Sequence, residues 1–127
     1  MMTFSETLDM HINALINRDL ETFQKTLVPD DRLSVILQNG SRLADFNDII
    51  HFHKTWFSDP DWSLELNLLS TWSNQQTGCA TFQVNYADID PTGKAYQLRY
   101  LLSLIFINEN ENWLLVLDQN TMLPKVR

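Results

Sequence analysis

The chain has 127 residues, of which 44% are hydrophobic and 20% are charged. These values are typical of one folded domain, which we predict to span residues 1–127, and they exclude an intrinsically disordered chain. Sixteen acidic against nine basic residues give a formal net charge of −7. That charge opposes binding to the phosphates of nucleic acids and to anionic membranes, so we expect neither as a partner.

The N-terminal segment lacks the features of an export signal. Glu6 and Asp9 stand where such a signal carries positive charge followed by an unbroken apolar run. The longest apolar stretch, Leu101–Ile107, is far shorter than the roughly 20 residues that cross a bilayer. The single cysteine, Cys79, excludes an internal disulfide. We therefore expect a cytoplasmic location.

The first half of the sequence predicts helices. Thr3 and Glu6 have the spacing of a capping box, so a helix begins directly after Thr3. Asp19 is placed to cap a second, shorter helix, and Asp45 a third. The aliphatic run within residues 32–37 predicts a short strand between the second and third helices.

The second half predicts four long strands joined by hairpin turns. Their expected ranges are Trp62–Ser73, Cys79–Asp88, Tyr96–Asn108 and Trp113–Asn120. Helices followed by such a meander predict an α+β fold, in which the N-terminal helices pack on one face of an antiparallel sheet.

The faces of these strands predict an assembly. The second long strand alternates apolar and polar residues, as a strand with one buried face does. By contrast, Leu101–Ile107 and Leu114–Leu117 are apolar on both faces, so Leu101, Ile105, Leu115 and Leu117 would leave an exposed apolar patch. We expect a homodimer through this sheet face. The alternative is that a curled sheet or the C-terminal tail covers it.

Two segments carry a family resemblance. FHKTWFSDPDW, residues 52–62, and WLLVLDQNT, residues 113–121, resemble the SnoaL-like group of the nuclear transport factor 2-like (cystatin-like α+β) superfamily. The resemblance implies a cone, in which helices close a strongly bent sheet around one pocket per subunit, and it implies that homodimers are common. The superfamily hosts isomerases, cyclases, hydrolases, dehydratases and members that only bind or dimerise, so the fold does not assign the reaction.

The sequence departs from the family pattern at a place that bears on catalysis. Many members carry histidines in the terminal strand at the positions of Leu117 and Gln119 here. Because these histidines are absent, the family resemblance gives weaker support for a general base in this chain.

Three residues are candidates for catalysis. His11 and His53 fall on the apolar faces of helices expected to flank the pocket, and an imidazole moves protons near neutral pH. Asp118 ends the terminal strand and would act as a base if burial raised its pKa. The alternatives are core histidines with hydrogen-bond partners, and an aspartate that only fixes the strand end.

Aromatic and amide side chains are candidates for lining a ligand pocket, although aromatic residues on a core face can also serve packing alone. The set is Trp56, Trp62, Tyr86, Tyr100 and Gln119.

No motif predicts a metal or a cofactor. The spacing of His51 and His53 does not suit one helical face. We place Gly40, Gly78 and Gly93 in turns, with no phosphate-binding loop.

Two hypotheses follow from these residues. The first is a protein that binds a small apolar or amphipathic molecule without an assignable reaction. The second is a cofactor-independent enzyme of the isomerase, dehydratase or cyclase type that uses the inward histidines for proton transfer.

Overall fold

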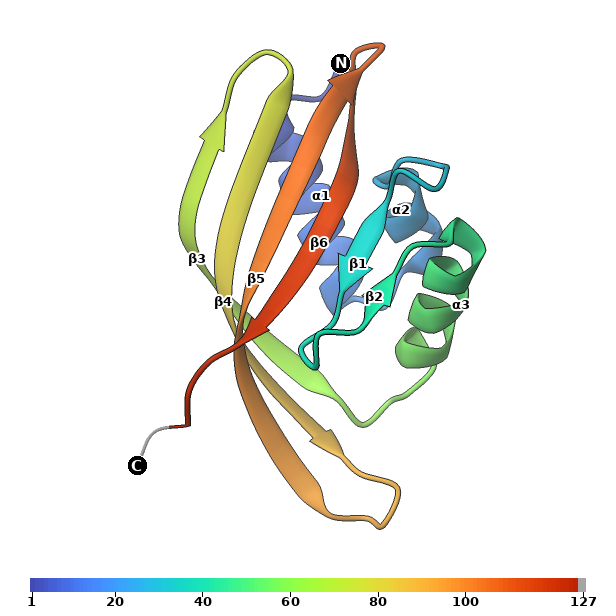
Figure 1. The fold of residues 1–127 in the computed structure, drawn as a ribbon, viewed down its shortest axis with the longest axis vertical. Coiled ribbons are helices and arrows are strands. Elements are labelled where there is room, and N and C mark those ends of the chain that lie inside the picture. Colours follow the sequence, from blue (N-terminus) through green and yellow to red (C-terminus); the bar gives the residue numbers. More distant parts are fainter. Residues whose placement is uncertain (126–127) are drawn as a thin grey trace.

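The computed structural model describes residues 1–125 as helices packed on one side of a six-stranded sheet with strand order β2-β1-β6-β5-β4-β3 (Figure 1). The elements are α1 (Phe4–Ile16), α2 (Leu20–Lys25), β1 (Ser34–Ile36), β2 (Arg42–Leu43), α3 (Phe46–Phe57), β3 (Ser63–Ser73), β4 (Thr77–Ile89), β5 (Ala95–Glu109) and β6 (Asn112–Met122). Within this range, none of the helices has the length and apolar character needed to cross a membrane.

The predicted helix starts are confirmed by their caps. Thr3 and Glu6 form a complete capping box at α1, and the side chains of Asp19 and Asp45 accept backbone hydrogen bonds at the starts of α2 and α3. These side chains satisfy N–H groups that have no partner within the helix. The three helices therefore begin where the local sequence predicts.

The α+β class and the meander of β3 to β6 are confirmed, and the sheet bends strongly along β4 and β5 (Figure 1). One pairing differs from the antiparallel prediction, because β1 runs parallel to β6 with Val35 opposite Asp118. The two-residue strand β2 was not predicted, since so short a segment carries no periodicity. The sheet is therefore mixed at this edge.

A β-bulge corrects the predicted faces of the terminal strand. Ile105 pairs with Leu117 and Phe106 with Leu115, so Val116 is the extra residue in β6. A bulge changes which face the following residues occupy. Leu115 consequently lies in the core at 1% exposure, although we expected it beside Leu117 on the outer face.

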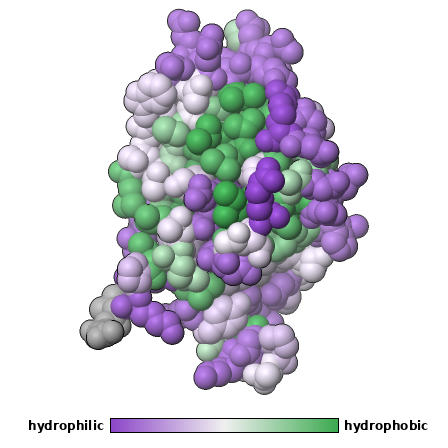
Figure 2. Space-filling view, viewed as in Figure 1, coloured by the Kyte–Doolittle hydropathy of each residue, from purple (hydrophilic) through white to green (hydrophobic). Residues whose placement is uncertain are grey.

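The outer face of the sheet, opposite the helices, carries an apolar row across four strands. Trp72, Cys79, Ile105 and Leu117 are consecutive cross-strand partners in this row, and Trp72 is 58% exposed. Figure 2 looks onto this face and shows apolar side chains gathered over the strands and framed by polar ones. Cys79, Ile105 and Leu117 are only partly buried, although they lie on interior strands of the sheet.

Gly78 lies in β4 and not in a turn, which corrects the prediction. It is buried against the ring of Phe4, where a Cβ atom would come closer than 3.0 Å to three ring atoms. Phe4 in turn packs against Phe106 and Trp113, with ring centroids 5.6 and 5.4 Å away. This glycine therefore allows the start of α1 to approach the sheet.

Candidate functional site

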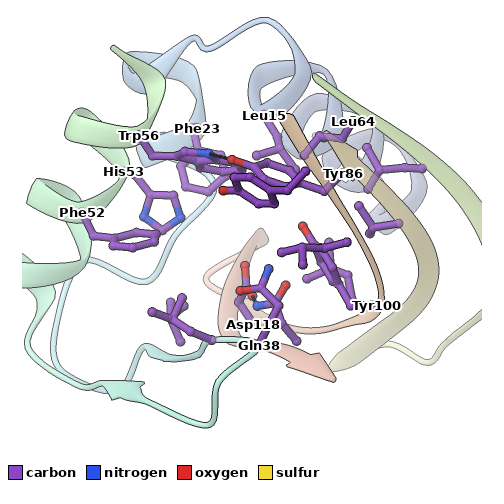
Figure 3. A pocket seen from close by; sticks show the side chains of 18 residues that line it. Leu15, Phe23, Gln38, Phe52, His53, Trp56, Leu64, Tyr86, Tyr100 and Asp118 are labelled. Carbon is purple, nitrogen blue, oxygen red and sulfur yellow. Dashed lines mark hydrogen bonds between the residues drawn. The ribbon is translucent and has the colours of Figure 1, made fainter. Parts of the chain in front are cut away.

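A cavity of about 220 Å³ lies between the helices and the inner face of the sheet. Figure 3 shows Trp56 and Tyr86 on one side of it and Asp118, Gln38 and Tyr100 on the opposite side. Tyr96 also lines the cavity and is 38% exposed, so the cavity reaches solvent beside it. Most of the remaining walls are aliphatic or phenylalanine side chains contributed by α1, α2, α3 and the strands.

On the first side, a hydrogen-bonded chain satisfies the hydroxyl of Tyr86. The indole N–H of Trp56 donates to this hydroxyl at 3.1 Å, and the hydroxyl donates to Oδ2 of Asp88 at 2.6 Å. Burial, and next the bond to Asp88, raise the pKa of Tyr86. The hydroxyl proton of Tyr86 is already donated to Asp88. Tyr86 therefore presents its aromatic ring to a ligand and has no free hydrogen-bond donor.

On the opposite side, Asp118 is a buried carboxyl group with incomplete hydrogen bonding. It is 9% exposed, and the side-chain amide of Asn120 donates to its Oδ1 at 2.8 Å and to the carbonyl of Ile36 at 2.9 Å. Its Oδ2 has no donor among the described residues. Burial raises the pKa of Asp118 to about 7, with the bond from Asn120 acting in the opposite direction.

Tyr100, on β5, lies on the same side of the cavity as the carboxyl group of Asp118 (Figure 3). Burial raises the pKa of its hydroxyl. A hydrogen bond with the Gln38 side chain lowers this pKa, and the charge of Asp118 raises it further. Tyr100 therefore keeps its proton at neutral pH and can donate it in a hydrogen bond to a bound molecule.

His53 lines the cavity from α3. Its Nδ1–H donates to the carbonyl of Ile49 at 2.8 Å, because a carbonyl can only accept. Nε2 is thereby left as the acceptor in the neutral ring. Burial lowers the pKa of His53, so the ring is neutral at physiological pH.

His11 does not line this cavity. Thr26 gives its hydroxyl proton to the carbonyl of Phe23 at 2.6 Å, so His11 donates from Nδ1 to the Thr26 oxygen at 2.7 Å. The imidazole also stacks on Phe23, with ring centroids 4.6 Å apart. Burial, and next the neighbouring His53, lower the pKa of His11 to about 3. This environment is that of a satisfied core histidine, which was the alternative to the catalytic role.

Trp62 and Gln119 also lie away from the cavity. Trp62 is buried, stacks on Trp56 at a centroid distance of 4.4 Å and donates to the Trp56 carbonyl at 2.7 Å. The guanidinium of Arg18 covers the Trp62 ring at 3.7 Å, so Trp62 positions Trp56. Gln119 is exposed and lies opposite Ser103 on the outer face of the sheet. The structure thus brings five predicted residues together: His53, Trp56, Tyr86, Tyr100 and Asp118.

Sequence reasoning missed Gln38, Tyr96 and Asn120 in the cavity wall. Asn120 could have been found from strand parity, because it lies two residues after Asp118 on the same face of β6. Gln38 has no local signal, since only the parallel pairing of β1 with β6 brings it there. No three His, Cys, Asp or Glu residues within 1–125 are grouped so that they could hold a metal ion.

The comparisons with known proteins agree on the fold. A model described as a SnoaL-like domain matches residues 5–120, and no curated protein sequence matches the chain. A nuclear transport factor 2-like superfamily protein from Salmonella enterica is similar with a TM-score of 0.77 at 14% identity, covering 96% of this chain and 89% of that one.

Two further solved structures have the same fold. A candidate dehydratase of the NTF2-like family from Streptomyces avermitilis has a TM-score of 0.74 at 12% identity, with 94% and 93% of the two chains covered. The association domain of C. elegans CaMKII has a TM-score of 0.64 at 14% identity, with 93% and 92% covered.

Proposed function

This chain belongs to the SnoaL-like domain family, and from that premise we propose that its cavity binds one small, largely apolar molecule per subunit. The observation that carries the proposal is the contrast between mostly apolar walls and a few polar side chains. Asp118 Oδ2 has no donor among the described residues, and the Tyr100 hydroxyl keeps its proton. Binding sites in proteins commonly combine apolar walls with a few such groups, which orient the ligand.

Filling the cavity tests this proposal. Leu64 lines the cavity from β3, whereas Leu69 on the same strand is 56% exposed and lies outside it. We expect the neutral probe phenethyl alcohol at millimolar concentration to raise the melting temperature of the wild type by a few degrees. The shift should disappear in Leu64→Trp and persist in Leu69→Trp. A wild type that does not respond to saturating probe would contradict the proposal.

A second candidate function is proton transfer without a cofactor, now centred on Asp118. A general base works best when its pKa is near the working pH, and burial places that of Asp118 at about 7. His53 and Tyr100 share the cavity as a neutral acceptor and a donor. We expect α-proton exchange of a small cyclic ketone in D₂O, followed by NMR, to be accelerated by the wild type and not by Asp118→Asn. Equal rates in both proteins would reject this function.

We also propose that a second copy of the chain covers the outer face of the sheet. The row Trp72–Cys79–Ile105–Leu117 supports this proposal, because an apolar strip of this kind is a favourable surface for burial and is unusual on a monomer. A two-fold axis would place the strip of each copy against the other. The CaMKII domain of the same fold is named for association, which agrees with an assembling role.

A further inference from the structure

Among the described residues that line the cavity, Asp118 supplies the one carboxyl group, which carries a negative charge when it ionises. Within residues 1–125, no lysine or arginine side chain is among those lining the cavity. Arg18 donates to the carbonyl groups of Asp59 and Trp62 and lies over the Trp62 ring, and Trp62 itself does not line the cavity. An anionic ligand would therefore lose its hydration without gaining an ion pair.

The remaining wall suits a cation. Six aromatic side chains line the cavity, and those of Trp56 and Tyr86 face Asp118 from the opposite side (Figure 3). Ring faces attract an ammonium group, and most strongly when both are shielded from water. Asp118, which is 9% exposed, leaves Oδ2 free of donors from the described residues. A protonated amine supplies an N–H donor to that oxygen and a positive charge opposite the carboxylate, whereas a quaternary ammonium group supplies the charge alone.

We propose that the molecule bound in this cavity carries a protonated or quaternary amino group on a small apolar body, and that Asp118 pairs with this cation. The inference rests on the proposed binding function and specifies the class of its ligand. The net charge of −7 acts in the same direction, because it attracts cations toward the protein.

The proposal has a defined dependence on pH. The titratable groups that share the cavity with Asp118 are His53 from α3, Tyr86 from β4, and Tyr96 and Tyr100 from β5. Burial raises the pKa values of the three tyrosines and lowers that of His53, so all four are neutral at pH 7 to 8. With the pKa of Asp118 at about 7, affinity for a cation should rise as the carboxyl group ionises.

Isothermal titration calorimetry with three matched probes tests the proposal: phenethylamine, phenethyl alcohol and phenylacetate. At pH 8 the amine is protonated, as lysine is, and we expect it to bind at least tenfold more tightly than the alcohol, with phenylacetate weakest. From pH 8 to pH 6, affinity for the amine should fall about tenfold, since each pH unit below the pKa leaves about tenfold less carboxylate. The permanent cation phenyltrimethylammonium should follow the same trend.

Asp118→Asn separates the charge from the shape of the site. We expect this variant to bind the amine no better than the alcohol and to lose the pH dependence, while its retained affinity for the alcohol shows an intact cavity. Asp9→Asn removes the same charge from the exposed face of α1 and should behave as the wild type.

The outcomes distinguish the two proposals. Equal affinity for amine and alcohol in the wild type, or tightest binding of phenylacetate, would overturn the cation inference and leave the binding function standing. A wild type that binds none of the probes would overturn both.

Discussion

The ionised carboxyl group of Asp118 destabilises the folded protein in which it is buried. Its carboxyl group is buried, and a single side-chain amide donates to it. Burial therefore raises its pKa to about 7, well above the ordinary value of an aspartate. Groups of this kind are often retained at functional sites despite their energetic cost. His11 contrasts with it, because its imidazole is hydrogen-bonded to Thr26 and packed against Phe23 and Phe106.

The free energy of unfolding should depend on pH because of this carboxyl group. Between an unfolded pKa near 3.8 and a folded pKa of about 7, the folded state binds more protons, so the free energy of unfolding falls as pH rises through this window. The loss due to Asp118 is on the order of several kcal/mol by pH 8. Asp118→Asn keeps the acceptor for Asn120 and carries no charge. We expect it to unfold at higher urea concentration than the wild type at pH 8, with the difference nearly gone at pH 4.

Asp9→Asn is the control for this measurement, since Asp9 is exposed and should shift neither midpoint. An Asp118→Asn variant that is less stable than the wild type to the same degree at both pH values would contradict the prediction.

At the scale of the elements, two irregular features build the site. The bulge at Val116 brings Leu115 into the core and leaves Leu117 on the outer face. The parallel pairing of β1 with β6 places Val35 beside Asp118, and the Asn120 amide bonds the Ile36 carbonyl of the same strand. Helix α3 then closes the cavity with Phe52, His53 and Trp56, which lie on one face at helical spacing.

At the scale of the whole molecule, the sheet has two differently used faces. The inner face meets the helices and the cavity, whereas the outer face carries the row Trp72–Cys79–Ile105–Leu117. A charged residue in the centre of a buried apolar contact lacks a partner and costs several kcal/mol. On a sheet face open to water, the same change has a small effect.

This difference makes the dimer testable. We expect light scattering at micromolar concentration to give twice the mass of the chain for the wild type. Leu101→Lys combined with Ile105→Lys should give a folded protein with the mass of one chain. Asn47→Lys combined with Thr55→Lys places two lysines on the exposed side of α3, away from the outer face of the sheet, and is the matched control that should remain dimeric. A monomeric wild type would refute the assembly, as would a double variant of unchanged mass.

Much of the fold could be predicted from local patterns. Thr3, Asp19 and Asp45 mark helix starts because capping depends on residues within one turn. The alternation in β4 predicts its buried face because side chains along a strand point to opposite sides. Strand parity failed at Leu115, since the bulge depends on the partner strand. Gly78 was misplaced in a turn because its reason, the approach of Phe4, lies far away in the sequence.

The sequence by itself therefore determined the class of fold, the strand segments that are apolar on both faces (Leu101–Ile107 and Leu114–Leu117) and the family. Each of these depends on periodicity or on short contiguous segments. Only the tertiary structure decided which polar residues meet. His11 and His53 both lie on apolar helix faces, yet His11 is enclosed by Phe23, Phe106 and Thr26 while His53 reaches the cavity. That distinction depends on which side chains from other elements fill the space in front of each ring, and helical periodicity does not encode it.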